Sequence, residues 1–190
     1  DGGNTSPALT WRNPPAGTKS YVLTVYDPDA PTGIGWTHWV VANIPAATRS
    51  LPAAITPEGQ GLPEGALQTR NDIGVPGYMG ACPPKGSNHR YIFKLTALKI
   101  DRLPNVDANA TPALVGFFTR TNALGEAKFT GRYGRGNHAI PITRHDSASR
   151  PVSGVGACHD TSPNSGFPPL FFSAHARQSA GIRNAAGIAR

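Results

Sequence analysis

Two carboxylates and two histidines, each close to a proline-rich bend, are the residues of this sequence best suited to chemistry. Asp27 and Asp29 lie in the stretch DPDAP, His38 lies in the following THWVV segment, and His89 follows a second bend, GACPPKGSN. We expect a carboxylate near two imidazoles to raise the imidazole pKa values and create a positively charged pocket. Such a pocket suits a phosphate or sulfate oxyanion, with Tyr91 or a loop N–H as a further donor.

The same side chains leave other interpretations open. A lone histidine in a strand is more often a structural hydrogen-bonding group than a ligand-binding group. Asp27, His38 and His89 could supply three metal ligands, but the chain has no HxH or HExxH pair. Cys82 or Ser87 could act as a nucleophile, but no helix is expected next to Cys82 and no GxSxG motif is present. We therefore expect ligand binding without catalysis, a metal or a cofactor.

Three strands must position these groups. Residues 20–27 alternate so that Leu23, Val25 and Asp27 share a face, and residues 37–44 form the next strand. Residues 89–100 form the strongest strand, in which Tyr91 shares a face with His89. Because all three site residues lie at strand ends beside irregular loops, we expect them to meet at one edge of a sheet.

The second strand carries a specific expectation about its faces. Regular alternation places Trp36, His38 and Val40 on one face and Trp39 and Val41 on the other.

The remaining segments predict short elements joined by loops. Residues 1–11 predict a turn that leads into an edge segment, and residues 28–35 are irregular, with Ala30–Pro31 a candidate cis bond. Residues 46–80 lack periodicity and form a long loop. Residues 111–121 predict a helix, with Thr111 as its N-cap and Pro112 as its first residue, and residues 126–133 predict a last strand.

Composition supports a mainly β protein and argues against several classes of function. The chain has 22 glycines and 19 prolines among 190 residues, which is typical of many turns and short strands. The net charge is +7, but the basic residues are scattered rather than interleaved with aromatic residues, so we expect no nucleic-acid partner. No apolar run approaches the length of a membrane span.

The sequence changes in character after Arg135. Residues 136–190 have no strand or helix period and few strongly apolar side chains, so we expect a disordered tail or a non-native extension. Residues 1–135 are expected to form one domain. The chain begins with Asp1 within a loop-like segment, and we expect that opening strands or a leader precede it.

Four segments resemble the phosphatidylethanolamine-binding protein family, in particular its bacterial and archaeal branch. They are DGGNTSPALTW, DPDAPTGIGWTHWVVANIP, GYMGACPPKGSNHRYIFKLTAL and LGEAKFTGRYGR, in order from Asp1 to about Arg135. The resemblance implies a large antiparallel sheet packed on a smaller one, a few peripheral helices, and a small surface pocket for phosphate-like groups. Carried over residue by residue, the implied ligand-binding residues are Asp27, Asp29, Pro31, Trp36, His38, Gly80, Pro83, Pro84, His89 and Tyr91.

The resemblance also shapes the functional expectation. We expect non-enzymatic binding of a phosphate-like anion, such as a phospholipid headgroup or a phosphorylated ligand, with modulation of a protein partner such as a kinase by analogy. The alternative is a hydrolase or a protease inhibitor that uses the same Asp/His pocket. We expect a cytoplasmic protein, with a periplasmic location and a homodimer left open.

Overall fold

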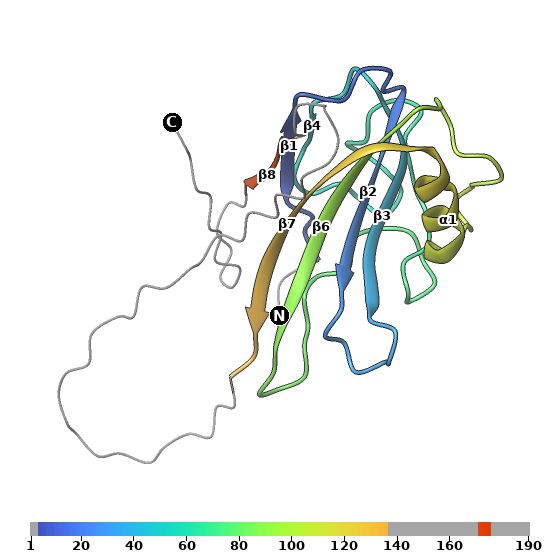
Figure 1. Cartoon of the computed structure of the whole chain (residues 1–190). Helices are drawn as coiled ribbons and strands as arrows, with labels where there is room; N and C mark the ends of the chain where they lie inside the picture. Colours follow the sequence, from blue (N-terminus) through green and yellow to red (C-terminus); the bar gives the residue numbers. More distant parts are fainter. Residues whose placement is uncertain (1–3, 137–170, 176–190) are drawn as a thin grey trace, which may run out of the picture.

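The chain folds into two antiparallel sheets and a helix within residues 4–136 and 171–175, the part that this computed structural model describes (Figure 1). The large sheet has the strand order β5-β3-β2-β6-β7. Its strands are β2 (Ser20–Asp27), β3 (Trp36–Pro45), β5 (Leu67–Gln68), β6 (Asn88–Leu98) and β7 (Ala123–Gly134). The predicted mainly β architecture is confirmed, and the three strands expected to carry the site are neighbours in this sheet.

The small sheet has the order β4-β1-β8, with β1 (Ala8–Arg12), β4 (Ser50–Leu51) and β8 (Phe171–His175). The expectation of an edge strand near the start of the chain is wrong, because β1 pairs with β4 on one side and with β8 on the other. Residues 136–190 were expected to be disordered, but Phe171–His175 pairs along all of β1. The rest of that tail, from residue 137, lies outside the described residues.

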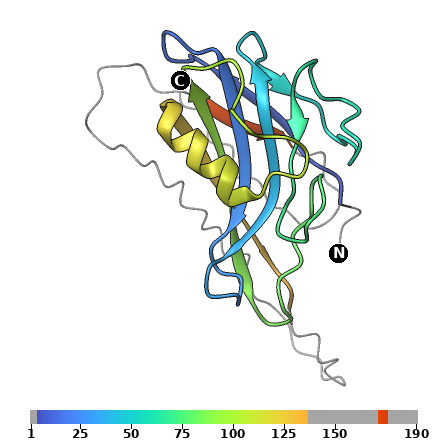
Figure 2. The same ribbon diagram turned by 90° about the vertical axis from the view of Figure 1, so that its right-hand side faces the viewer.

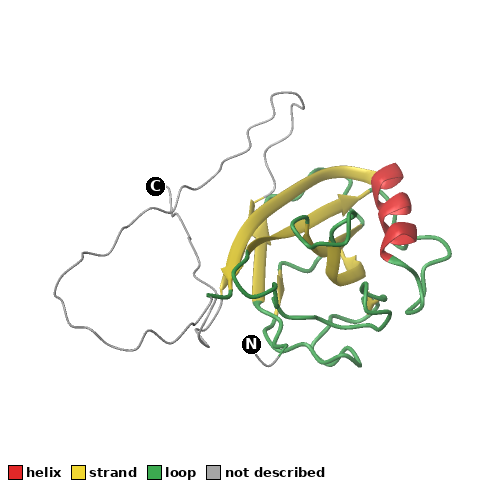
Figure 3. Cartoon of the chain, turned by 90° about the horizontal axis from the view of Figure 1, so that it is seen from below, coloured by secondary structure: helices red, strands yellow, loops and turns green. Residues whose placement is uncertain are grey.

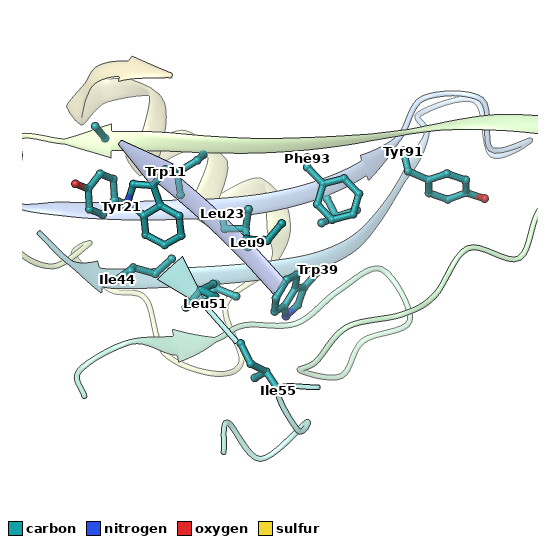
Figure 4. Packing of buried hydrophobic residues seen from close by; sticks show 14 residues of the cluster. Leu9, Trp11, Tyr21, Leu23, Trp39, Ile44, Leu51, Ile55, Tyr91 and Phe93 are labelled. Atoms are coloured by element: carbon teal, nitrogen blue, oxygen red, sulfur yellow. The ribbon is translucent and has the colours of Figure 1, made fainter. Parts of the chain in front are cut away.

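The hydrophobic core lies between the two sheets. Leu9 and Trp11 of β1 and Leu51 of β4 pack against the large sheet, which contributes Leu23 and Trp39 among others (Figure 4). β6 supplies the residues that the alternation predicted for this face, Tyr91, Phe93, Leu95 and Ala97. Burial of these apolar side chains holds the strand ends near Asp27 and His89 rigidly in register.

Helix α1 (Pro112–Asn122) covers the opposite face of the large sheet (Figures 2 and 3). It begins as predicted, with the Thr111 hydroxyl accepting a hydrogen bond from the Leu114 N–H and proline in the first turn. Val115 packs against Val22 and Val40 in a second apolar cluster. No helix within the described residues is long and apolar enough to cross a membrane.

Candidate functional site

A β-bulge in β3 sets the direction of His38. In the pairing of β2 with β3, Val25 faces Trp39 whereas Tyr26 faces Thr37, so His38 is the extra residue of the bulged strand. A bulge interrupts the alternation of side chains and turns one of them to the other face of the sheet. Bulges are common next to functional sites for this reason.

The predicted shared face of His38 and Val40 is therefore wrong. Val40 packs toward α1, whereas the His38 ring lies against the Tyr91 ring with centroids 5.1 Å apart. Trp36 and His38 do share a face, as expected, and both line the same pocket. The strand pattern predicted the position of His38 along β3, but the bulge turns its side chain toward the site.

Asp27 ends β2 as a buried carboxylate held between two neighbours. Its side chain is 4 % exposed, and Oδ2 accepts a hydrogen bond of 2.7 Å from His89 Nδ1. Oδ1 accepts a hydrogen bond of 2.8 Å from the Asp29 N–H. Since Nδ1 of His89 donates to a carboxylate, Asp27 orients this ring with Nε2 as the free ring nitrogen.

The backbone holds the second imidazole in place. His38 Nδ1 lies 3.0 Å from the carbonyl oxygen of Met79, and a carbonyl can only accept, so Nδ1 carries a proton. His38 Nε2 lies 4.0 Å from Asp27 Oδ2. A neutral His38 consequently presents an unprotonated nitrogen, which cannot donate to an anion until it binds a second proton.

The structure contradicts the expected electrostatics at His38. Burial lowers the pKa of His38 below its usual value, and this cost outweighs the opposing effects of the Met79 carbonyl and of the Asp27 and Asp72 carboxylates. The nearby carboxylate is evident from the sequence, but the depth at which the imidazole is buried is not.

Tyr91 provides a neutral donor beside the two histidines. Tyr91 is 5 % exposed, and its buried hydroxyl has no hydrogen-bond partner among the residues that the structure describes. Burial raises the pKa of Tyr91 far above its usual value, so the hydroxyl stays protonated. A buried hydroxyl without a partner is costly, which indicates that a ligand or water satisfies it.

These groups surround a pocket of about 260 Å³. Most of the residues implied by the family resemblance line it, namely Asp27, Pro31, Trp36, His38, Pro83, Pro84, His89 and Tyr91. The pocket has four further lining residues that were not predicted as part of the site, namely Ala30, Thr32, Met79 and Cys82. The role of Met79 depends on its backbone carbonyl, for which a sequence carries no signal. The Ala30–Pro31 bond is trans, so the candidate cis bond is wrong.

Asp29 and Gly80 do not line the pocket but support it. The Asp29 carboxylate accepts hydrogen bonds from the Arg90 guanidinium, at 2.6 Å from Nη2 and 2.9 Å from Nε, and another from the Arg90 N–H. This bidentate pair attaches the loop after β2 to β6 and holds the pKa of Asp29 well below its usual range. Gly80 donates its N–H to Asn4 Oδ1 at 2.9 Å.

The segment between β5 and β6 depends on a glycine with an unusual backbone. Gly77 has φ = +110°, and a Cβ added there would lie 3.2 Å from Pro57 Cα. We expect Gly77→Ala to destabilise the protein by about 1–3 kcal/mol through backbone strain, and by more through the clash. The matched control is Gly74→Ala, which has φ = +99° but open space around its Cβ. Urea unfolding should show the larger loss for Gly77→Ala, and equal losses would contradict the clash.

Within the described residues, no cluster of three His, Cys, Asp or Glu side chains is arranged to hold a metal ion. The site therefore offers two imidazoles, a carboxylate and a phenol around a small pocket. This combination can bind an oxyanion through hydrogen bonds, provided that protons are available at the imidazoles.

Comparisons with known proteins identify the family to which the chain belongs. A family model described as phosphatidylethanolamine-binding protein matches residues 1–134. The UPF0098 protein YbcL of Escherichia coli (strain K12) is 54% identical over 135 residues, covering 70% of this chain and 73% of the relative. The UPF0098 protein YbhB of the same organism is 53% identical over 133 residues, covering 70% of this chain and 84% of the relative.

A solved structure shows the same fold. The crystal structure of E. coli YbcL, described as a new member of the mammalian PEBP family, superposes with a TM-score of 0.68 at 53% sequence identity. The match covers 70% of this chain and 82% of that one. The chain therefore belongs to the phosphatidylethanolamine-binding protein family, in the branch that contains these UPF0098 proteins.

Proposed function

We propose that the protein is a non-enzymatic module that binds a phosphate-like anionic group in the pocket between β2, β3 and β6. The observation that carries this proposal is the buried Tyr91 hydroxyl, which has no partner within the described part of the chain and belongs to a residue that lines the same pocket as His38 and His89. A phenol that stays protonated and two imidazoles fit the oxygen atoms of a phosphate ester or a phospholipid headgroup.

The charge of the pocket suits an anion only after protonation. Asp27 contributes a negative charge, and a neutral His38 contributes none. Binding of an anion favours the protonated form of His38, which places a positive charge beside the anion. This coupling makes the proposed affinity depend on pH.

The same geometry favours binding over turnover. Asp27 is held by His89 and by the Asp29 N–H, which is the arrangement of a group that orients its neighbours. The Thr32 hydroxyl, which also lines the pocket, donates to the Gly35 carbonyl at 2.6 Å. Neither group is placed as a nucleophile next to a base, as covalent catalysis requires. The hydrolase alternative therefore ranks second.

The proposal is tested by NMR titration of the imidazole protons. Phosphorylethanolamine and inorganic phosphate are added separately while the His38 and His89 signals are followed. We expect both signals to shift and saturate with either ligand, and tighter binding of phosphorylethanolamine would point to a headgroup. Unchanged signals at both histidines would overturn the proposal, and hydrolysis of a phosphate or acyl ester that His38→Ala abolishes would favour an enzyme.

Tyr91→Phe supplies a matched test of the same site. Removing the hydroxyl is expected to weaken phosphate binding by about tenfold, the effect of one lost hydrogen bond. Tyr133→Phe is the control, because Tyr133 lines a small neighbouring cavity and not the pocket. Equal affinities for the two variants would show that the Tyr91 hydroxyl does not contact the ligand.

A further inference from the structure

Cys82 is an exposed thiol in the wall of the pocket. Its sulfur carries no disulfide, and its side chain lines the same cavity as His38, His89 and Tyr91. The proline pair that follows it, Pro83 and Pro84, forms the adjoining part of the wall. A group attached to this sulfur would occupy the space in which we place the anion.

A positive charge lies against the thiol. Arg135 Nη1 lies 3.6 Å from Cys82 Sγ and 3.5 Å from the Pro83 carbonyl oxygen. The Arg135 backbone accepts from the Gly86 N–H at 2.7 Å and donates to the Ser87 carbonyl at 3.1 Å, so this end of β7 is fixed to the Cys82 loop. Reactive cysteines occur in such exposed, electropositive surroundings.

A second, independent feature points to a ligand in this space. Tyr91 lines the pocket, and its buried hydroxyl has no partner among the described residues, so it offers a hydrogen bond to an oxyanion that enters beside Cys82. A carboxylate presents the same kind of oxygen atoms as a phosphate ester. A small molecule that carries both carboxylates and a reactive sulfur could thus be held by its anionic end while its sulfur meets Cys82.

We propose that Cys82 is a thiolation site at which a carboxylate-bearing small disulfide is held in the pocket and forms a mixed disulfide that blocks anion binding. This inference rests on the proposed function of the pocket. The Cys82 thiolate attacks one sulfur of the disulfide, a Cys82–sulfur bond forms and the original disulfide bond breaks. The second thiolate leaves and takes up the proton that Cys82 released, so Cys82 is oxidised and the small disulfide is reduced.

The test uses the full chain and glutathione disulfide as the probe. Its reaction rate at Cys82 is measured by peptide mapping, which separates Cys82 from Cys158, the second cysteine of the sequence. The uncharged hydroxyethyl disulfide is the matched reagent. The rate of each disulfide at Cys82 is divided by the rate of the same disulfide with N-acetylcysteine, which corrects for its intrinsic reactivity. We expect the corrected rate to be about tenfold higher for glutathione disulfide, and to fall when sulfate is added or in Arg135→Gln.

Binding measurements complete the test. The glutathione adduct at Cys82 is expected to lose sulfate binding, and reduction with dithiothreitol is expected to restore it. Cys82→Ser should keep its own sulfate affinity, whatever its value, after treatment with glutathione disulfide. Equal corrected rates for the two disulfides, or an adduct that binds sulfate normally, would overturn the inference. If the unmodified parent protein binds no sulfate, the proposed function fails as well, which distinguishes the two outcomes.

Discussion

Sulfate binding is expected to weaken as the pH rises, because the anion binds best when His38 is protonated. In the free protein, burial holds the pKa of His38 below about 6.5, its ordinary value. A bound anion raises that pKa. Affinity is therefore highest below the free-state pKa, falls by up to about tenfold per pH unit above it, and levels off above the pKa of the complex. Sulfate is the suitable probe because its own charge is constant over this range.

Calorimetry in two buffers with different ionisation enthalpies counts the protons taken up on binding. At pH 7 the His38→Gln variant should take up about one proton fewer per bound sulfate than the parent protein. Glutamine is a suitable replacement, because its amide is polar and does not titrate in this pH range. The same affinity at pH 5.5 and pH 8, or an unchanged proton count in the variant, would contradict the role of His38.

The same lowered pKa has a consequence for the free protein. Between the folded-state pKa of His38 and about 6.5, the unfolded chain binds more protons than the folded one. The stability that His38 contributes is thus complete above its pKa in the unfolded chain. It is lost as the pH falls toward its pKa in the folded protein. Added sulfate should reduce this loss of stability at low pH in the parent protein, and it should have a smaller effect in His38→Gln.

Asp27→Ala is expected to cost about 3 kcal/mol of unfolding free energy. The substitution removes a carboxylate whose side chain is 4 % exposed and leaves His89 Nδ1 and the Asp29 N–H without their acceptor. Unsatisfied buried donors are expensive because water cannot reach them. Urea unfolding followed by tryptophan fluorescence measures the loss.

Asp29→Ala is the matched control for that change. It also removes an aspartate from a charged pair, but Asp29 and Arg90 are partly exposed, with side-chain exposures of 29% and 45%. Exposed pairs contribute little because water and salt screen them. A much smaller loss is therefore expected for Asp29→Ala, and equal losses would show that burial of Asp27 is not what makes it important.

The site depends on how three separate segments are fastened together. β2 brings Asp27, the bulge in β3 brings His38, and β6 brings His89 and Tyr91. The Asp29–Arg90 pair attaches the loop after β2 to β6, and the Met79 carbonyl holds His38 from the segment before β6. Ligand binding at this position would therefore connect all three segments.

Local sequence patterns located the three strands that carry the site and the helix, but not the short strands β4 and β5 within the expected loop of residues 46–80, and the family resemblance supplied most of the lining residues. The strands around Asp27 and His89 and the helix that begins at Thr111 follow from alternation and capping, which are short-range effects. Two prolines and a histidine in each bend were enough to indicate one shared pocket. These signals lie within a few neighbouring residues, so a sequence can carry them.

Three features became apparent only in the tertiary structure. The bulge at His38 depends on how β3 pairs with β2, and the pairing of β8 with β1 joins residues far apart in the chain. The lowered pKa of His38 depends on burial beneath elements from several parts of the chain. The sequence thus determined which groups are available for binding. Strand register and desolvation, which arise from long-range packing, determine where His38 points and in which direction its pKa shifts.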